Sequence, residues 1–86
     1  MTLKEVTITK NEPLSNREVS ILVNHAMRFD SEIFIEQGSK KINCKSIMGV
    51  LSLNLRKDSK IIIIAKGSDE TEALEDLLKI IDNNFQ

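Results

Sequence analysis

Residues 44–51, CKSIMGVL, place a hydroxyl group directly before two large apolar side chains. Serine is a preferred N-cap, so Ser46 is expected to open a helix with Ile47 and Met48 in its first turn. The start of a helix has free N–H groups, and these stabilise a negative charge. Ser46 with its apolar neighbours is therefore a candidate docking site, and a plain helix cap is the alternative.

A second hydroxyl group, that of Ser15, lies in PLSNREV at residues 13–19. With Glu18 it forms the pattern S-x-x-E, which predicts a capping box at the start of another helix. Arg17, in the first turn of that helix, is either a solvated side chain or a contact for a partner. Ser15 itself is best explained as a helix cap.

The other reactive side chains offer little chemistry. His25 is expected on the exposed side of a helix, and the single cysteine, Cys44, is expected to be a small buried hydrophobe. We expect no metal and no cofactor. The net charge of -1 and the lack of Tyr and Trp argue against direct binding of nucleic acid.

A membrane location is not expected either. The longest apolar run, Ile61 to Ala65, is too short to span a membrane. The N-terminal stretch has no continuous apolar segment and is not a signal peptide. With one unpaired cysteine, these features indicate a cytoplasmic protein.

The strands and helices that position these residues follow from the apolar pattern. Alternating apolar residues predict strands, and apolar residues three and four apart predict helices. The predicted strands lie at residues 3–9, 32–36, 40–44 and 60–66, and the predicted helices at 16–28, 46–54 and from 69 onward. Asp69 and Glu72 form a D-x-x-E pattern, which predicts a further cap at the last helix.

The element order predicts a single α+β domain over residues 1–86, with a four-stranded antiparallel sheet and three helices on one face. The other face of such a sheet meets water. There Phe34, Ile62 and Ile64 would form an apolar patch, which indicates a second interface for a homodimer or another partner. The alternative is that these residues only favour strand formation.

The sequence resembles the HPr family, the small phosphocarriers of bacterial sugar phosphotransferase systems. The resemblance extends over nearly the whole chain and is most specific in KSIMGVLSL at residues 45–53. GSDETEAL at residues 67–74 supports it. The resemblance implies the open-faced β-sandwich of that family, with the order βαββαβα.

The family implies a histidine at the start of the first helix, in a pattern G-[IL]-H-A-R-P-A, that receives a phosphoryl group from enzyme I. Ser15 stands in the place of that histidine and Glu18 in that of the proline, while Arg17 is kept. His25 lies about two and a half turns further along the helix and cannot replace it. A serine phosphoester is too stable to pass its phosphoryl group on, so phosphocarrier activity is expected to be absent.

The family also implies a regulatory serine that opens the second helix, here Ser46. In low-GC Gram-positive members, the ATP-dependent HPr kinase/phosphorylase modifies this serine, and the phospho-form binds catabolite control protein A, a transcription regulator. The resemblance therefore implies a phosphoprotein of carbon catabolite repression that is not an enzyme. Ile47, Met48 and Leu51 would form the apolar patch that both partners contact, with Arg17 beside it.

Two other functions stay open. One is a phosphocarrier with altered chemistry that uses Ser15 as the acceptor. The other is a degenerate HPr domain that binds a different protein through its sheet.

Overall fold

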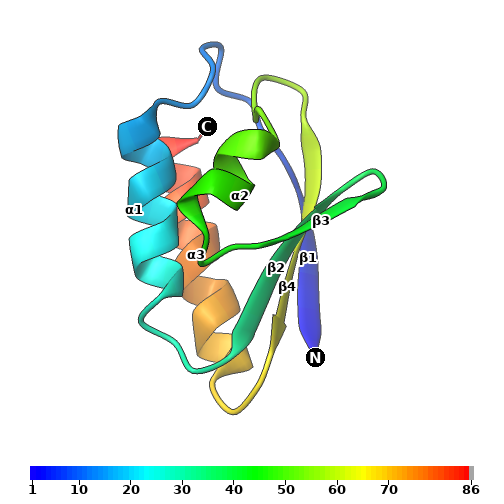
Figure 1. Cartoon of the computed structure of the whole chain (residues 1–86), viewed down its shortest axis with the longest axis vertical. Helices are drawn as coiled ribbons and strands as arrows, with labels where there is room; N and C mark the ends of the chain where they lie inside the picture. Colours follow the sequence, from blue (N-terminus) through cyan, green and yellow to red (C-terminus); the bar gives the residue numbers. More distant parts are fainter. Residues whose placement is uncertain (86) are drawn as a thin grey trace.

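The computed structural model describes residues 1–85, which form two layers (Figure 1). One antiparallel sheet has the strand order β1-β4-β2-β3, and the helices cover one of its faces. The elements are β1 (Thr2–Thr7), α1 (Asn16–Ala26), β2 (Glu32–Gln37), β3 (Lys40–Asn43), α2 (Ile47–Ser52), β4 (Lys60–Lys66) and α3 (Glu70–Asn84). The predicted α+β class and element order are confirmed. No helix within residues 1–85 is long and apolar enough to cross a membrane.

The first two helices end earlier than predicted. α1 stops at Ala26, because the Arg28 N–H bonds the His25 carbonyl at 3.1 Å in a tighter turn. In the same way, the Asn54 N–H bonds the Leu51 carbonyl at 3.1 Å, so α2 is only six residues long. A helix this short has little surface with which to bury its own apolar side chains.

The core lies between the sheet and the helices, as the apolar stripes predict. Strand β4 contributes Ile61, Ile63 and Ala65, all with no exposed surface. Burying a side chain the size of isoleucine stabilises the fold by about 1.5–3 kcal/mol. The helices supply the opposing stripes: Val19, Leu22, Val23 and Ala26 from α1, and Ala73, Leu74, Leu77 and Ile81 from α3.

The opposite side of the sheet, here called the open face, carries no helix within residues 1–85 (Figure 1). The expected apolar patch requires the strands with Phe34 and Ile64 to pair. They do pair, and these two residues stand directly opposite each other. Leu3 of β1 pairs with Ile64 from the other side. Because it is flanked on both sides, Ile64 is only 7% exposed although no helix covers it.

Asp69 is the N-cap residue of α3, as predicted, but the side-chain bond expected from the D-x-x-E pattern is not formed. The Asp69 side chain makes no bond to the start of α3. Its carboxylate instead accepts the N–H groups of Asp30 and Ser31, each at 2.9 Å, and the Ser31 hydroxyl. The bonds from the Ser31 hydroxyl and the Asp30 N–H hold the pKa of Asp69 below its ordinary value. Asp69 thus ties the α1–β2 loop to the β4–α3 loop.

Gly67 allows the two loops to approach each other closely. Its φ of 151° is one that side-chain-bearing residues rarely adopt. A Cβ atom at this position would lie 2.7 Å from the Cα atom of Ser31. A side chain at position 67 would therefore push the two loops apart.

We predict that Gly67→Ala lowers the free energy of unfolding by about 2 kcal/mol or more, because it adds both backbone strain and a clash with Ser31. Gly38→Ala is the matched control: Gly38 also has a positive φ, of 60°, but a Cβ there meets nothing within 4 Å. The control variant should lose only about 1 kcal/mol. Urea unfolding followed by circular dichroism measures both, and equal losses would contradict a role for the loop contact.

Candidate functional site

Ser46 is the N-cap of α2, as predicted. Its hydroxyl oxygen accepts the Gly49 N–H at 3.1 Å, and its carbonyl accepts the Val50 N–H at 3.0 Å. The Ser46 N–H in turn donates to the carbonyl of Asn43, at the end of β3, at 3.0 Å. The hydroxyl group is therefore held at one place on the rim between the sheet and the helices.

Gly49 lies directly against the Ser46 side chain. A Cβ atom on Gly49 would be 3.3 Å from both the Cβ and the Oγ of Ser46. The absence of a side chain leaves the serine hydroxyl room at the helix start. This observation gives the glycine of KSIMGVLSL a physical role beside the serine.

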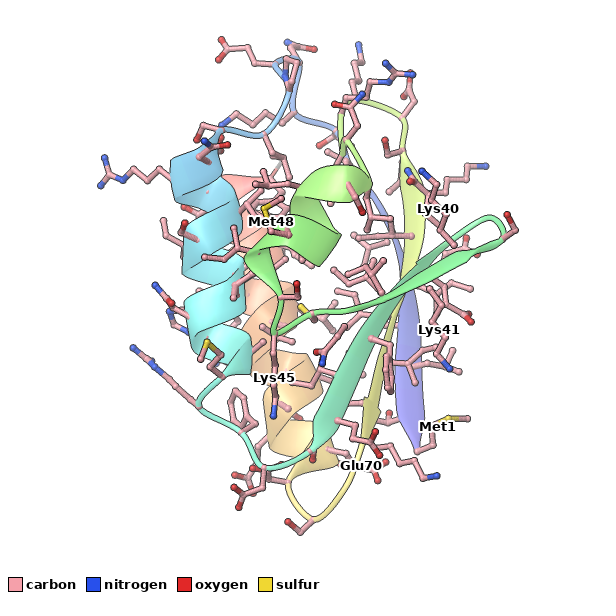
Figure 2. The ribbon with its side chains drawn as sticks, viewed as in Figure 1. Met1, Lys40, Lys41, Lys45, Met48 and Glu70 are labelled. Atoms are coloured by element: carbon pink, nitrogen blue, oxygen red, sulfur yellow. The ribbon has the colours of Figure 1, made fainter. Side chains whose placement is uncertain are left out.

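The surroundings of Ser46 contain no nearby carboxylate from its own helix, since the first turn of α2 has no acidic residue. The neighbouring Lys45 does not face the hydroxyl. Its ammonium donates to the Phe29 carbonyl at 2.7 Å, and Figure 2 shows the side chain extending away from α2. A negative charge on Ser46 would meet amide N–H groups and no acidic side chain of α2.

The apolar residues expected beside Ser46 differ in exposure. Ile47 is 41% and Met48 78% exposed, so two large apolar side chains face solvent next to the serine. Leu51 is half-buried and packs against the core. It borders a groove of about 210 Å³ between the start of α1 and α2, together with Leu14. The structure thus places all three residues on one short helix with Ser46.

Arg17 lies on the neighbouring helix. It is exposed in the first turn of α1, and within residues 1–85 its side chain makes no hydrogen bond or ion pair. Its position in the first turn leaves its guanidinium group open to solvent.

The capping box predicted at Ser15 is confirmed. The Ser15 hydroxyl oxygen accepts the Glu18 N–H at 3.2 Å, and Glu18 Oε1 accepts the Ser15 N–H at 2.9 Å. The same carboxylate oxygen accepts the Ser15 hydroxyl at 3.0 Å, while Lys10 pairs with Oε2. Every polar group of Ser15 that could act on a substrate is engaged in holding the helix start.

Glu18 is a poor base for Ser15. Burial raises the pKa of its carboxyl group, but the bond from Lys10 and the two bonds from Ser15 outweigh this and hold the pKa below its ordinary value of 4.5. A carboxylate whose pKa is lowered in this way is a weaker general base toward the serine hydroxyl.

These local features fit one family. The family profile described as "PTS HPr component phosphorylation site" matches residues 3–83. The chain belongs to the HPr family.

Individual relatives agree with this assignment. The chain is 44% identical to the HPr-like protein Crh of Halalkalibacterium halodurans strain C-125, over 95% of this chain and 98% of that protein. Among solved structures, HPr-C-His from Thermoanaerobacter tengcongensis superposes with a TM-score of 0.91 at 34% identity, covering 99% of this chain and 96% of that one. Crh of Bacillus subtilis, described as a dimer with a swapped domain, gives 0.76 at 36% identity, with 100% and 99% coverage.

Two other reactive residues lie away from the starts of α1 and α2. His25 is not the exposed side chain that was expected: it is half-buried, and its Nδ1 lies 2.9 Å from Asp76 Oδ2, which links α1 to α3. The partner is 51 positions away, so no local pattern could have revealed it. Cys44 is fully buried as predicted, and burial raises the pKa of its thiol to about 12.

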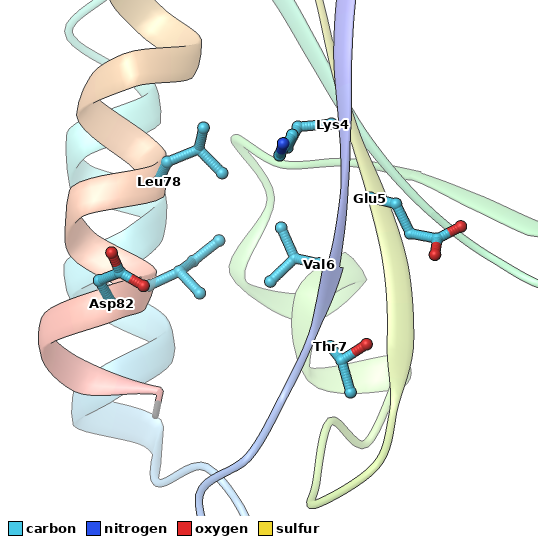
Figure 3. A pocket seen from close by; sticks show the side chains of 7 residues that line it. Lys4, Glu5, Val6, Thr7, Leu78 and Asp82 are labelled. Atoms are coloured by element: carbon cyan, nitrogen blue, oxygen red, sulfur yellow. The ribbon is translucent and has the colours of Figure 1, made fainter.

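A larger groove, of about 330 Å³, lies between β1 and α3. Figure 3 shows Lys4 and Val6 directed toward α3 and Leu78, whereas Glu5 points away from the helix. None of the predicted site residues lines this groove. The two candidate hydroxyl groups, of Ser15 and Ser46, lie instead at the starts of α1 and α2.

We predict that Glu18→Gln is less stable than the parent protein by about 0.5–1 kcal/mol at neutral pH, because it loses the charge that pairs with Lys10. Since the folded pKa lies below 4.5, ionised Glu18 contributes stability above that value and loses it as the pH falls through the folded pKa. The difference between variant and parent should therefore shrink in acid. Urea unfolding over a pH series measures this, with the exposed Glu12→Gln as control, and a pH-independent difference would contradict it.

Proposed function

We propose that this HPr-family chain is a regulatory protein of carbon catabolite control. An ATP-dependent HPr kinase phosphorylates Ser46, and the phospho-form then binds a transcription regulator of the catabolite control protein A type. The names of relatives support this direction, because a solution structure of the Bacillus subtilis protein describes Crh as "Catabolite Repression HPr". In this proposal the chain is itself neither an enzyme nor a carrier of a cofactor.

The observation that carries the proposal is the arrangement at the start of α2. Ser46 is half-buried there: its backbone N–H donates to the Asn43 carbonyl, its hydroxyl oxygen accepts the Gly49 N–H, and it stands next to the exposed Ile47 and Met48. Phosphorylation would add about −1.5 to −2 charges and three acceptor oxygens beside an apolar surface. An arginine or lysine of the regulator would bind the phosphate while apolar side chains cover Met48 and Ile47.

The contacts of Ser15 argue against the phosphocarrier alternative. In our proposal Ser15 replaces the phosphorylated histidine of the family and serves as a cap. Its hydroxyl is bonded to a weakly basic carboxylate, and Glu18 would repel an incoming phosphate. Arg17 remains available to the regulator as an exposed cation of the neighbouring helix, and Leu51 supports the apolar patch from below.

We predict that the protein incubated with ATP and an HPr kinase from a low-GC Gram-positive bacterium gains the mass of one phosphoryl group, and that peptide mapping places it on Ser46. Ser46→Ala should gain none, whereas Ser15→Ala should be modified like the parent protein. If an ordinary HPr in the same tube is phosphorylated and this protein is not, the proposal fails.

We further predict that Met48→Ala weakens binding of the phospho-form to the regulator by about 1–3 kcal/mol, as expected for an interface anchor. Because Met48 is 78% exposed, its removal should leave the unfolding free energy nearly unchanged. The matched control is Met27→Ala, since Met27 is 62% exposed but follows the C-terminal end of α1. Titration calorimetry measures the affinity of both variants for the regulator, and equal affinities would exclude Met48 as an anchor.

A further inference from the structure

The open face of the sheet has a regular arrangement of charged and apolar side chains. Residues that stand opposite each other on paired strands share a face of the sheet. Across the strands β1-β4-β2-β3, one row of the open face reads Glu5, Ile62, Glu36, Lys41, and the next reads Leu3, Ile64, Phe34, Asn43. A third row pairs Lys66 with Glu32, and Lys60 lies at the other end of β4.

The charges on this face balance, yet they are not paired within the chain. The face has three carboxylates, of Glu5, Glu32 and Glu36, and three lysines, Lys41, Lys60 and Lys66. Within residues 1–85 the ion pairs lie elsewhere, at Glu70, Glu18 and His25. Lys41 has only an aromatic contact, with its ammonium 4.7 Å from the centre of the Phe34 ring. Figure 2 shows Lys41 on the side of β3 away from the helices.

From this pattern we propose that the open face binds the open face of a second copy of the chain. The two-fold axis lies between the two stacked sheets, runs parallel to the strands, and passes over the line midway between β4 and β2. This rotation exchanges β1 with β3 and β4 with β2 while it keeps each row in place. Glu5 then lies over Lys41 of the second copy, and Lys66 over Glu32. Ile64 lies over Phe34 of the second copy, so the apolar centre is covered as well.

The other two-fold axis in the plane of the sheet does not give this match. An axis across the strands exchanges the rows, so that Glu5 meets Leu3 of the second copy and Lys60 meets Lys66. That arrangement places no opposite charge over Glu5 or Lys41 and brings two ammonium groups together, which is unfavourable. The arrangement of charges therefore selects the axis parallel to the strands, and stacked sheets also prefer nearly aligned strands.

The exposed apolar residues of the open face support its contact with a second copy of the chain. Leu3 is 53% exposed beside Ile64, and Phe34 and Ile62 are half-buried in the isolated chain. The position of Ile62, which would meet Glu36 of the second copy, limits the affinity. The association leaves every strand in its own chain, unlike the dimer with a swapped domain described for Crh of Bacillus subtilis.

The test is sedimentation equilibrium of the full chain up to about 1 mM, with single and paired charge reversals. Glu5→Lys and Lys41→Glu each replace two ion pairs of the dimer by two like-charge contacts, so each should raise the dissociation constant about tenfold. The double variant Glu5→Lys/Lys41→Glu restores opposite charges across the axis and should recover most of the affinity. Added salt should weaken the parent dimer.

The controls reverse exposed charges on α3, on the other layer of the fold. Glu75→Lys and Lys79→Glu change the net charge by the same amounts and should leave the dissociation constant unchanged. Circular dichroism confirms that each variant is folded. A parent protein that stays monomeric at about 1 mM overturns the proposal. So does a dimer that neither single reversal weakens, because such a dimer uses another surface or exchanged strands.

Discussion

Strand β4 is central to the sheet and packs Ile61, Ile63 and Ala65 against the helices, with no exposed surface on any of them. Because side chains alternate along a strand, the same strand must place Ile62 and Ile64 on the other side. None of the helices α1, α2 and α3 covers that side. Because the helices pack on only one face of the sheet, that face forms the core, and the other face is left as a surface with apolar residues at its centre.

The position of Ser46 also depends on the sheet more than on its own helix. Cys44 donates its N–H to the Ile33 carbonyl at 2.8 Å and so continues the pairing of β3 with β2. Asn43 then accepts the Ser46 N–H. The chain therefore enters α2 from a fixed point, and α2 is too short to turn Ile47 and Met48 away from water.

The sequence was sufficient for the features that local patterns control. Period and capping signals predicted the element order, the buried stripes and the caps at Ser15 and Ser46. They failed where a side chain has a distant partner. Asp69 has the composition of a cap but bonds Ser31, 38 positions away, and His25 bonds Asp76. No periodicity encodes such contacts, because the tertiary packing of loops and helices decides them. The exposure of Met48 could not be predicted because it depends on the length of α2, which the apolar pattern overestimated.

Cys44 is a native probe of how often the segment that leads into α2 opens. Its buried thiol, with a pKa raised to about 12, is protonated and shielded at neutral pH, so a thiol reagent can reach it only when the β3–α2 junction opens. The rate of labelling then reports how often that junction opens. Since Ser46 lies two positions further along the chain, the native cysteine can register how firmly the serine is held, without any introduced probe.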